Sequence, residues 1–233
     1  MQFRRYKMRR VEEDGLIREQ IEYYRARAPD YDATSSPPGD PLAPYARPIE
    51  AALERFRPGG RVLEIASGTG VWTAHLLHHA GSVTALDASM EMHELSRAKI
   101  GDDPRVRRVT ADIFSWDPDG PYDVVFFANW LSHVPPGRFK QFWETVRAAL
   151  APAGRVFVVD EIEDAWRHEA LHEEFVVGPS VPVVSRSLAD GRTFRVVKQF
   201  WNPGALRAAL LAMGWEAEVH PVGPLFWAEA GRA

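Results

Sequence analysis

The sequence contains no cysteine among its 233 residues. Disulfide bonds, thiolate nucleophiles and thiolate metal ligands are therefore excluded as sources of stability or chemistry. Lysine is also scarce, because only 4 of the 28 basic residues are lysines. We interpret that bias as a sign of a GC-rich genome rather than of a physical demand on the protein.

Long hydrophobic runs are missing as well, and none reaches the length that crosses a membrane. The N-terminus lacks the apolar segment of a secretory signal, so we expect a cytoplasmic protein with no membrane partner. The formal net charge of −4 argues against a nucleic-acid partner. The length and a hydrophobic content of 45% suit one α/β domain with a full core.

The most informative segment present is the glycine-rich stretch Glu64–Gly70. It follows an apolar run, Arg61–Ile65, that is typical of a buried strand, and it precedes an amphipathic run that is typical of a helix. Such a turn lets the backbone approach a ligand closely. A second apolar strand, Val83–Leu86, ends in Asp87. An acid at that place typically binds ribose hydroxyls, so the order of these elements predicts a nucleoside site.

Two features of the turn favour S-adenosylmethionine over NAD. The third glycine of the dinucleotide fingerprint is absent, since Val71-Trp72-Thr73 follows Gly70. Glu64 would repel a pyrophosphate but would suit a ligand that carries an ammonium group. At this point the chain resembles the class I S-adenosylmethionine-dependent methyltransferases, whose first motif is an acid followed by x-G-x-G-x-G. Ala66 replaces the first glycine, and alanine still allows a tight turn.

The resemblance continues along the chain. Asp112 matches the acid that usually contacts the adenine amino group, and Phe126–Trp130 matches the fourth strand and the turn that faces the methyl donor. The segment Tyr23–Asp32 resembles the opening of the ubiquinone/menaquinone-type subgroup, where two tyrosines either close over the methionine part of the cofactor or simply pack the N-terminal helix. The expected cofactor contacts are Tyr24, Tyr31, Glu64, Ala66, Gly68, Gly70, Asp87, Ala88, Asp112, Ile113 and Asn129.

Alternating strand and helix patterns predict an α/β fold with a parallel sheet. Strands are expected at 61–65, 83–87, 106–110, 122–128 and 154–160, and helices at 71–80, 89–99 and 138–150. The resemblance implies a Rossmann-like, seven-stranded, mostly parallel sheet with helices on both faces and an antiparallel last strand. We divide the chain into an N-terminal leader and lid helix, a cofactor-binding core and a substrate cap with a β-hairpin, at 1–45, at 46–160 with 201–233, and at 161–200.

Methyl transfer requires above all that the nucleophile be positioned and water be excluded. A general base helps only when the acceptor must lose a proton, and His133 is the natural candidate because histidine titrates near neutrality. The alternative is a structural histidine that orients the turn before Val134-Pro135-Pro136. Trp130 lies beside it and suits a small, partly apolar acceptor. An oxygen or nitrogen acceptor atom is expected, while C-methylation stays open.

The segment His168-Glu169-Ala170-Leu171-His172 fits the H-E-x-x-H pattern of zinc proteases. Such short patterns arise by chance in a chain with 8 histidines, and no third ligand is marked by its spacing. We therefore assign no metal, and expect His168 and His172 either to line the acceptor pocket or to face solvent; a metal that serves the acceptor site stays open as an alternative.

Two rivals to the methyltransferase hypothesis remain open from the sequence. An NAD-dependent oxidoreductase would need the missing glycine and a hydride-transfer site. A non-catalytic S-adenosylmethionine-binding protein is compatible with the motifs, because methyltransferases need few obligatory side chains. A tailoring step in natural-product metabolism and a homodimer that pairs through the hairpin are further hypotheses.

Overall fold

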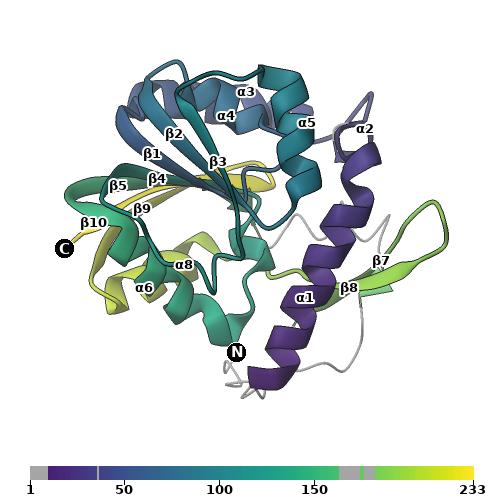
Figure 1. Cartoon of the computed structure of the whole chain (residues 1–233). Coiled ribbons are helices and arrows are strands. Elements are labelled where there is room, and N and C mark those ends of the chain that lie inside the picture. The colour runs from purple at the N-terminus through teal and green to yellow at the C-terminus, as the bar shows by residue number, and fades with distance from the viewer. Residues whose placement is uncertain (1–9, 36, 163–173, 176–181) are drawn as a thin grey trace.

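The computed structural model describes residues 10–35, 37–162, 174–175 and 182–233 (Figure 1). The main sheet contains β1 (Gly60–Ile65), β2 (Ala80–Asp87), β3 (Val106–Thr110), β4 (Tyr122–Ala128), β5 (Leu150–Glu161), β9 (Trp215–Val222) and β10 (Leu225–Arg232). The α-helices are α1 (Arg10–Arg27), α2 (Tyr31–Ser35), α3 (Ala43–Phe56), α4 (Val71–Leu76), α5 (Met90–Ile100), α6 (Phe139–Ala149) and α8 (Pro203–Ala212). Short 3-10 helices lie at Ala28–Asp30, Leu131–His133 and Pro136–Arg138.

The seven strands follow the order β3-β2-β1-β4-β5-β10-β9. The pairs from β3 to β5 are parallel, and β10 is antiparallel to both of its neighbours, β5 and β9. The predicted Rossmann-like sheet with an antiparallel last strand is therefore confirmed. Because β1 lies at the point where the strand order reverses, the loops after β1 and β4 flank the crevice where ligands of open α/β sheets bind.

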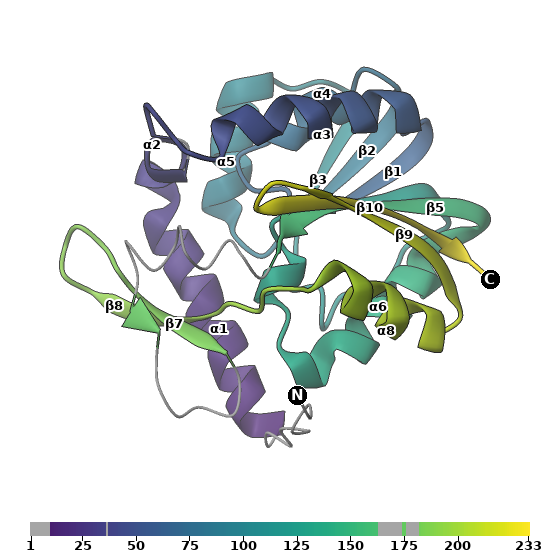
Figure 2. The same ribbon diagram turned by 180° about the vertical axis from the view of Figure 1, so that it is seen from behind.

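Helices cover both faces of the sheet, with α3, α4 and α5 on one side and α6 and α8 on the other (Figures 1 and 2). Successive residues of β4 divide between them, since side chains alternate along a strand. Val124 and Phe126 pack in the cluster that contains Leu53 of α3, whereas Val125 and Phe127 pack in the cluster that contains α6. This double burial explains why the strand is an uninterrupted apolar run.

A separate layer stands beside the carboxyl edge of the sheet. It consists of α1 and a small antiparallel sheet of β6 (Glu174–Phe175), β7 (Val183–Ser187) and β8 (Thr193–Val197). Leu16 of α1 packs with Val183 and Val197, so the helix and the hairpin share a core of their own. Figure 2 shows the hairpin crossing α1 away from the main sheet. We call α1 together with β7 and β8 the cap.

Several element boundaries differ from those that the sequence predicts. The helix expected at 71–80 ends at Leu76, because Ala80 already pairs with Gly60 at the start of β2. The strand expected from 154 begins at Leu150, which pairs with Tyr122 before a shift of register. In both places strand pairing overrides the local apolar pattern.

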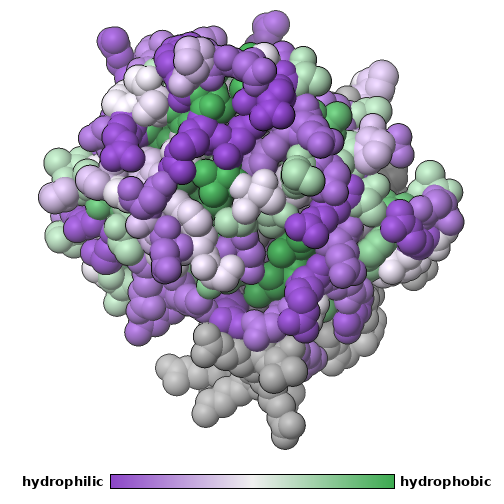
Figure 3. Space-filling model, in the orientation of Figure 1, coloured by the Kyte–Doolittle hydropathy of each residue, from purple (hydrophilic) through white to green (hydrophobic). Residues whose placement is uncertain are grey.

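The molecular surface in the orientation of Figure 3 is mostly hydrophilic, with small hydrophobic areas that are separated from one another. In the part of the chain that the structure describes, no helix is long and apolar enough to span a membrane. The pair His168 and His172 lies outside the described residues, so the expectations for these two histidines stay predictions.

Candidate functional site: a cofactor crevice under a cap

The glycine-rich turn after β1 places three residues in left-handed backbone conformations. Ala66, Gly68 and Gly70 have φ values of 54°, 53° and 82°. Glycine adopts this region freely, whereas an alanine there is strained. A side chain at Gly70 would also meet the Ser96 hydroxyl of α5 at 2.6 Å. The turn thus brings backbone N–H groups to the crevice and lets α4 and α5 pack closely.

Asp87, at the end of β2, holds this turn in place. Its Oδ2 accepts a hydrogen bond from the Gly68 N–H at 2.8 Å, and its Oδ1 accepts one from the Ser89 N–H at 2.9 Å. Burial raises the pKa of the Asp87 carboxyl, while these N–H groups oppose the rise. A carboxylate oxygen has lone pairs for more than one donor, so both oxygens can still accept the hydroxyls of a ribose.

A second acid follows β3. Asp112 accepts a hydrogen bond from the Phe114 N–H at 3.0 Å, and burial raises the pKa of its carboxyl. Asp112 and Ile113 line the same cavity as Asp87 and Gly68. At this position Asp112 can accept a hydrogen bond from the exocyclic amine of a purine, and Ile113 can form an apolar wall against the purine ring.

Glu64 differs from these two acids. It is 2% exposed, and its Oε2 accepts a hydrogen bond from the Thr73 hydroxyl of α4 at 2.6 Å. Burial raises the pKa of Glu64 to about 8. Neither Glu64 nor Gly70 is among the residues that line the cavity. The expected contact between Glu64 and a ligand ammonium stays a prediction, and its structural partner is Thr73.

The turn after β4 leads directly to the candidate base. Asn129 has a φ of 51°, which asparagine tolerates, and its N–H donates to Val159 O of β5 at 2.8 Å. The chain then enters the 3-10 helix that contains His133, which is 5% exposed. Trp130 lines the cavity, and its indole N–H has no hydrogen-bond partner among the described residues. That N–H is buried, so Trp130 contributes its apolar ring rather than a donor to the cavity.

His133 is held from the cap. Its Nε2 lies 2.9 Å from the Tyr24 hydroxyl of α1, and its Nδ1 lies 2.7 Å from Val197 O of β8. Arg186 of β7 also donates to the Tyr24 hydroxyl, at 3.3 Å. Tyr24 therefore contacts His133, and its expected contact with the cofactor stays a prediction.

A second set of contacts ties α1 and α2 to the loops that follow β1 and β2. Asp32 of α2 accepts from the Thr69 hydroxyl at 2.6 Å and pairs with Lys99 of α5 at 2.7 Å. Arg25 donates to Ala88 O at 2.8 Å, next to the expected ribose acid. We call the Asp32–Thr69–Lys99 cluster the latch, because it joins the segment that contains Tyr31 to the cofactor loop.

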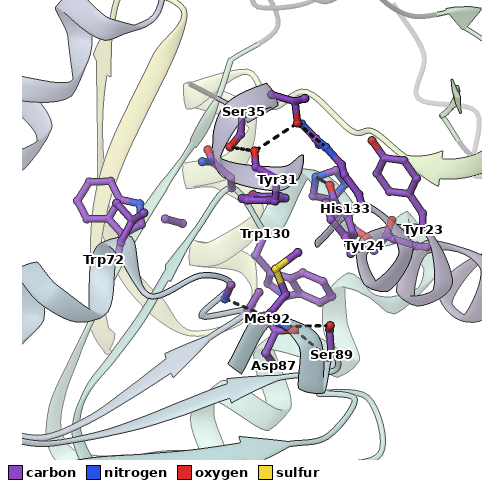
Figure 4. A pocket seen from close by; sticks show the side chains of 18 of the residues that line it. Tyr23, Tyr24, Tyr31, Ser35, Trp72, Asp87, Ser89, Met92, Trp130 and His133 are labelled. Carbon is purple, nitrogen blue, oxygen red and sulfur yellow. Dashed lines mark hydrogen bonds between the residues drawn. The ribbon is translucent and has the colours of Figure 1, made fainter. Parts of the chain in front are cut away.

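Tyr24, Asp87, Asp112, Trp130 and His133 line one cavity of about 1090 Å³. Figure 4 shows Tyr23, Tyr24 and His133 on one side of it, Trp72 on the other, and Asp87, Ser89 and Met92 between them. A pocket for one small ligand usually measures roughly 300–1,000 Å³, so this cavity has room for a nucleoside cofactor and a small acceptor. The expected residues that line it are Tyr24, Tyr31, Ala66, Gly68, Asp87, Ala88, Asp112, Ile113, Asn129, Trp130 and His133.

The same cavity is lined by three charged residues that the sequence analysis did not assign to the site. Glu161 at the end of β5 pairs with Lys198 at 3.0 Å, and both side chains are largely buried. Arg186 of β7 lines the same cavity. No motif marks these positions. A general signal was available, since charged residues inside an expected cap segment are candidates for contacts with a polar acceptor. Among the described residues, no group of three or more acids and histidines could hold a metal ion.

Comparison with known proteins gives a consistent result. The family described as "Methyltransferase domain" matches residues 62–154. The chain is 28% identical over 122 residues to a protein-L-isoaspartate O-methyltransferase of Polaromonas sp. strain JS666, covering 51% of this chain and 57% of that protein. It is 29% identical over 157 residues to the C-methyltransferase UbiE of ubiquinone/menaquinone biosynthesis from Azotobacter vinelandii, covering 64% and 61%. The chain thus spans little more than half the length of the first curated relatives it matches.

Solved structures match over nearly the whole chain. A DhpI–SAM–HEP complex is 45% identical, covers 93% of this chain and 97% of that chain, and has a TM-score of 0.78. A DhpI–SAH complex is 42% identical, with coverages of 94% and 98% and a TM-score of 0.77. Both contain a nucleoside of the kind that the crevice after β1 and β2 fits.

Proposed function

The chain belongs to the class I S-adenosylmethionine-dependent methyltransferases, and we propose that it methylates an oxygen or nitrogen atom of a small, partly apolar molecule. S-adenosylmethionine is the cofactor, and when bound it supplies the methyl group from its sulfonium sulfur. The observation that carries the proposal is that His133 and Trp130 line the same cavity as Asp87 and Asp112. One cavity therefore offers cofactor-binding acids and a candidate base.

The residues of the crevice fit this cofactor. The Asp87 carboxylate accepts from two backbone N–H groups and keeps lone pairs for ribose hydroxyls. Asp112 and Ile113 offer an acceptor and an apolar wall for adenine. Gly68 lets the backbone approach the ligand without a side chain in the way, since a Cβ there would meet nothing within 4 Å.

The other side of the cavity supports a small acceptor. The cap covers it through Tyr24 of α1, while Trp130 provides an apolar wall. Arg186, Lys198 and Glu161 add charge to this side, so the acceptor carries polar groups as well. The DhpI complex with HEP makes HEP the first compound to test as an acceptor.

A second candidate is a non-catalytic S-adenosylmethionine-binding protein. It would use the same crevice, and its distinguishing property would be binding without turnover. The NAD-dependent oxidoreductase is not favoured, because the similar solved complexes contain SAM or SAH.

The first experiment measures binding of S-adenosylhomocysteine by calorimetry, with NAD and NADP as controls, on wild type and Asp87→Ala. We expect micromolar binding of S-adenosylhomocysteine alone, which the variant loses. The second measures S-adenosylhomocysteine formation with HEP, catechol, tyramine and phenylpyruvate, which present different acceptor atoms. Binding without turnover of any acceptor would favour the non-catalytic reading, and NAD binding would contradict the proposal.

Assembly and partners belong to the same proposal. We propose a homodimer without nucleic-acid partners in the cytoplasm. Sedimentation velocity at several protein concentrations tests the dimer, and a monomer at all of them contradicts it.

A further inference from the structure

The Tyr24 hydroxyl makes polar contacts at the cavity in addition to the packing of its ring. It projects from the last turns of α1 into the cavity, 2.9 Å from His133 Nε2 and 3.3 Å from the Arg186 guanidinium that donates to it. Tyr24 belongs to α1, His133 to the turn that follows β4, and Arg186 to β7. The cap and the core therefore meet at one hydroxyl on the acceptor side of the cavity.

The neighbours of His133 decide which atom carries the proton. Val197 O only accepts, and it lies 2.7 Å from Nδ1, so Nδ1 is the protonated nitrogen of the neutral ring. Nε2 then accepts, and Tyr24 is the donor of the 2.9 Å bond. The hydrogen bonds run in one direction, from Arg186 to Tyr24, on to His133, and finally to Val197.

The arrangement is held rigidly. Gln20, one helical turn before Tyr24, donates to His133 O at 3.3 Å and accepts from the Val197 N–H at 3.2 Å. The Tyr24 ring packs edge-on against Tyr23 and His133, with centroids 5.0 and 5.5 Å apart. The phenol and the imidazole therefore keep their alignment without help from a ligand.

The surroundings keep Tyr24 a neutral phenol. Burial raises the pKa of its hydroxyl, and the charges of Arg186 and Lys198 oppose that rise while Tyr31 adds to it. Glu161 of β5 faces the same cavity. A buried phenol of this kind is a poor base by itself, but it can accept one proton while it passes another to a neighbour.

We propose that Tyr24 is a catalytic residue that relays the acceptor's proton to His133, an inference that rests on the proposed methyltransferase function. The acceptor O–H or N–H bond breaks as its proton moves to Tyr24 Oη, and the Tyr24 O–H bond breaks as its proton moves to His133 Nε2. The acceptor's lone pair forms the bond to the methyl carbon, and the electrons of the sulfur–methyl bond return to sulfur. The positive charge of the sulfonium thus ends on the imidazolium.

The relay specifies a class of acceptor. It serves a hydroxyl or amine that still carries its proton at neutral pH, and it gives no advantage once the nucleophile is ionised. The contribution of Tyr24 should therefore depend on pH in a way that a purely structural side chain would not.

Tyr24→Phe tests the relay, because it keeps the ring and removes only the hydroxyl. Tyr45→Phe of α3 is the matched control, since Tyr45 is not among the residues that line the cavity. The acceptor is HEP or catechol, whichever the wild type converts faster. We expect kcat at pH 7 to fall roughly 100-fold or more in Tyr24→Phe, as for loss of acid–base catalysis, with the control near wild type. The S-adenosylhomocysteine Kd should change less than about threefold, well under the tenfold that 1.4 kcal/mol represents.

The pH profile and a spectrum complete the test. The defect of Tyr24→Phe should shrink as the pH rises toward the pKa of the acceptor itself. In the S-adenosylhomocysteine complex, the ¹⁵N resonance of His133 Nε2 should shift in Tyr24→Phe, because a hydrogen bond to it is lost. An unchanged kcat, a defect independent of pH, or a large loss of S-adenosylhomocysteine affinity would each overturn the relay. Absence of turnover by the wild type, with binding intact, would overturn the proposed function and the relay with it.

Discussion

The two sides of the cavity are built in different ways. On the cofactor side, residues of one continuous stretch, from Ala66 to Asn129, stand on successive loops at the carboxyl edge of the sheet. The acceptor side joins Tyr24 of α1, His133 after β4 and Arg186 of β7. Local sequence thus forms the first side, whereas the second exists only after the cap has packed on the core.

The hydrogen bonds show the same difference. Asp87 is held by backbone N–H groups only 19 and 2 residues away, whereas Tyr24 contacts partners 109 and 162 residues away. Short-range backbone contacts form with the loops themselves. Long-range side-chain contacts depend on the docking of α1, which the buried Arg138 supports by pairing with Glu13 and Asp14. The cofactor side should therefore tolerate changes in the cap better than the acceptor side tolerates them.

The largest expected effect breaks the cofactor side alone. Asp87→Ala removes both the expected ribose acceptor and the anchor of the Gly68 N–H. Hydrogen bonds to charged groups contribute about 1.5–3 kcal/mol each, so the S-adenosylhomocysteine Kd should rise roughly 100-fold or more. Calorimetry measures this, with Asp117→Ala, at an exposed position, as the control. An unchanged Kd would show that the ribose is bound elsewhere.

The second change concerns Glu64, which is buried next to the glycine-rich turn and does not line the cavity. Burial raises the pKa of Glu64 from the model-compound value of 4.5 to about 8. Between these two values the unfolded chain has lost the proton that the folded chain keeps, so the free energy of unfolding should fall as the pH rises from 4.5 to 8.

Glu64→Gln should remove this part of the pH dependence. Urea unfolding at several pH values from 5 to 9 gives the free energy of unfolding as a function of pH. The same pH dependence in wild type and variant would contradict the prediction. S-adenosylhomocysteine binding by the same variant tests the ammonium contact independently. A large loss of affinity supports that contact, whereas unchanged affinity restricts Glu64 to its bond with Thr73.

The third change tests whether the Asp32–Thr69–Lys99 latch helps the cofactor side to retain its ligand. Asp32→Asn weakens the latch, so S-adenosylhomocysteine should dissociate faster. Asp32 and Lys99 are partly exposed, with side chains 50% and 32% accessible, so an effect of only about threefold is expected. Stopped-flow displacement measures the rate. Asp102→Asn is the control, because Asp102 forms an exposed pair with Arg97 in the same last turn of α5 as Lys99. A dissociation rate equal to that of the control would rule out the latch.

The latch also has a pH dependence of known sign. Hydrogen bonds from Lys99 and Thr69 lower the pKa of Asp32 in spite of partial burial. A carboxyl with a lowered folded pKa stabilises above its ordinary value of 3.8 and loses that effect as the pH falls through the folded value. The latch should therefore be fully formed at neutral pH and open only in acid.

The smallest expected effect concerns backbone strain in the glycine-rich turn of the cofactor side. Ala66 has a φ of 54°, a conformation that costs an L-residue about 1–2 kcal/mol. Ala66→Gly relieves this strain but adds backbone entropy to the unfolded chain, so we expect a net gain of about 0.5 kcal/mol in the free energy of unfolding. Urea denaturation measures it, and a destabilised variant would show that the Ala66 methyl group contributes packing that outweighs the strain.

Most residues that the sequence assigned to the cofactor line one cavity, and each of the signals that marked them is local. A strand that ends in a glycine turn, followed by a strand that ends in Asp87, leaves few possible arrangements for the chain. The carboxyl ends of neighbouring parallel strands meet at one edge, so the order of the motifs also predicts their proximity. The bond between Glu64 and Thr73 lay beyond such reasoning, since the residue type at a strand end does not reveal which partner its carboxyl contacts.

The motifs, with the family resemblance that they carry, predicted the sheet and the cofactor and suggested a candidate base, because these motifs are local patterns of a strand, a turn and a helix. Tertiary structure alone decided that Tyr24 donates to His133, that Arg186 and Lys198 share their wall, and that Asp32 reaches Thr69. These pairs are separated by long stretches of chain. Their meeting depends on how α1 and the hairpin pack together, a matter of side-chain shape that no local pattern in the sequence records.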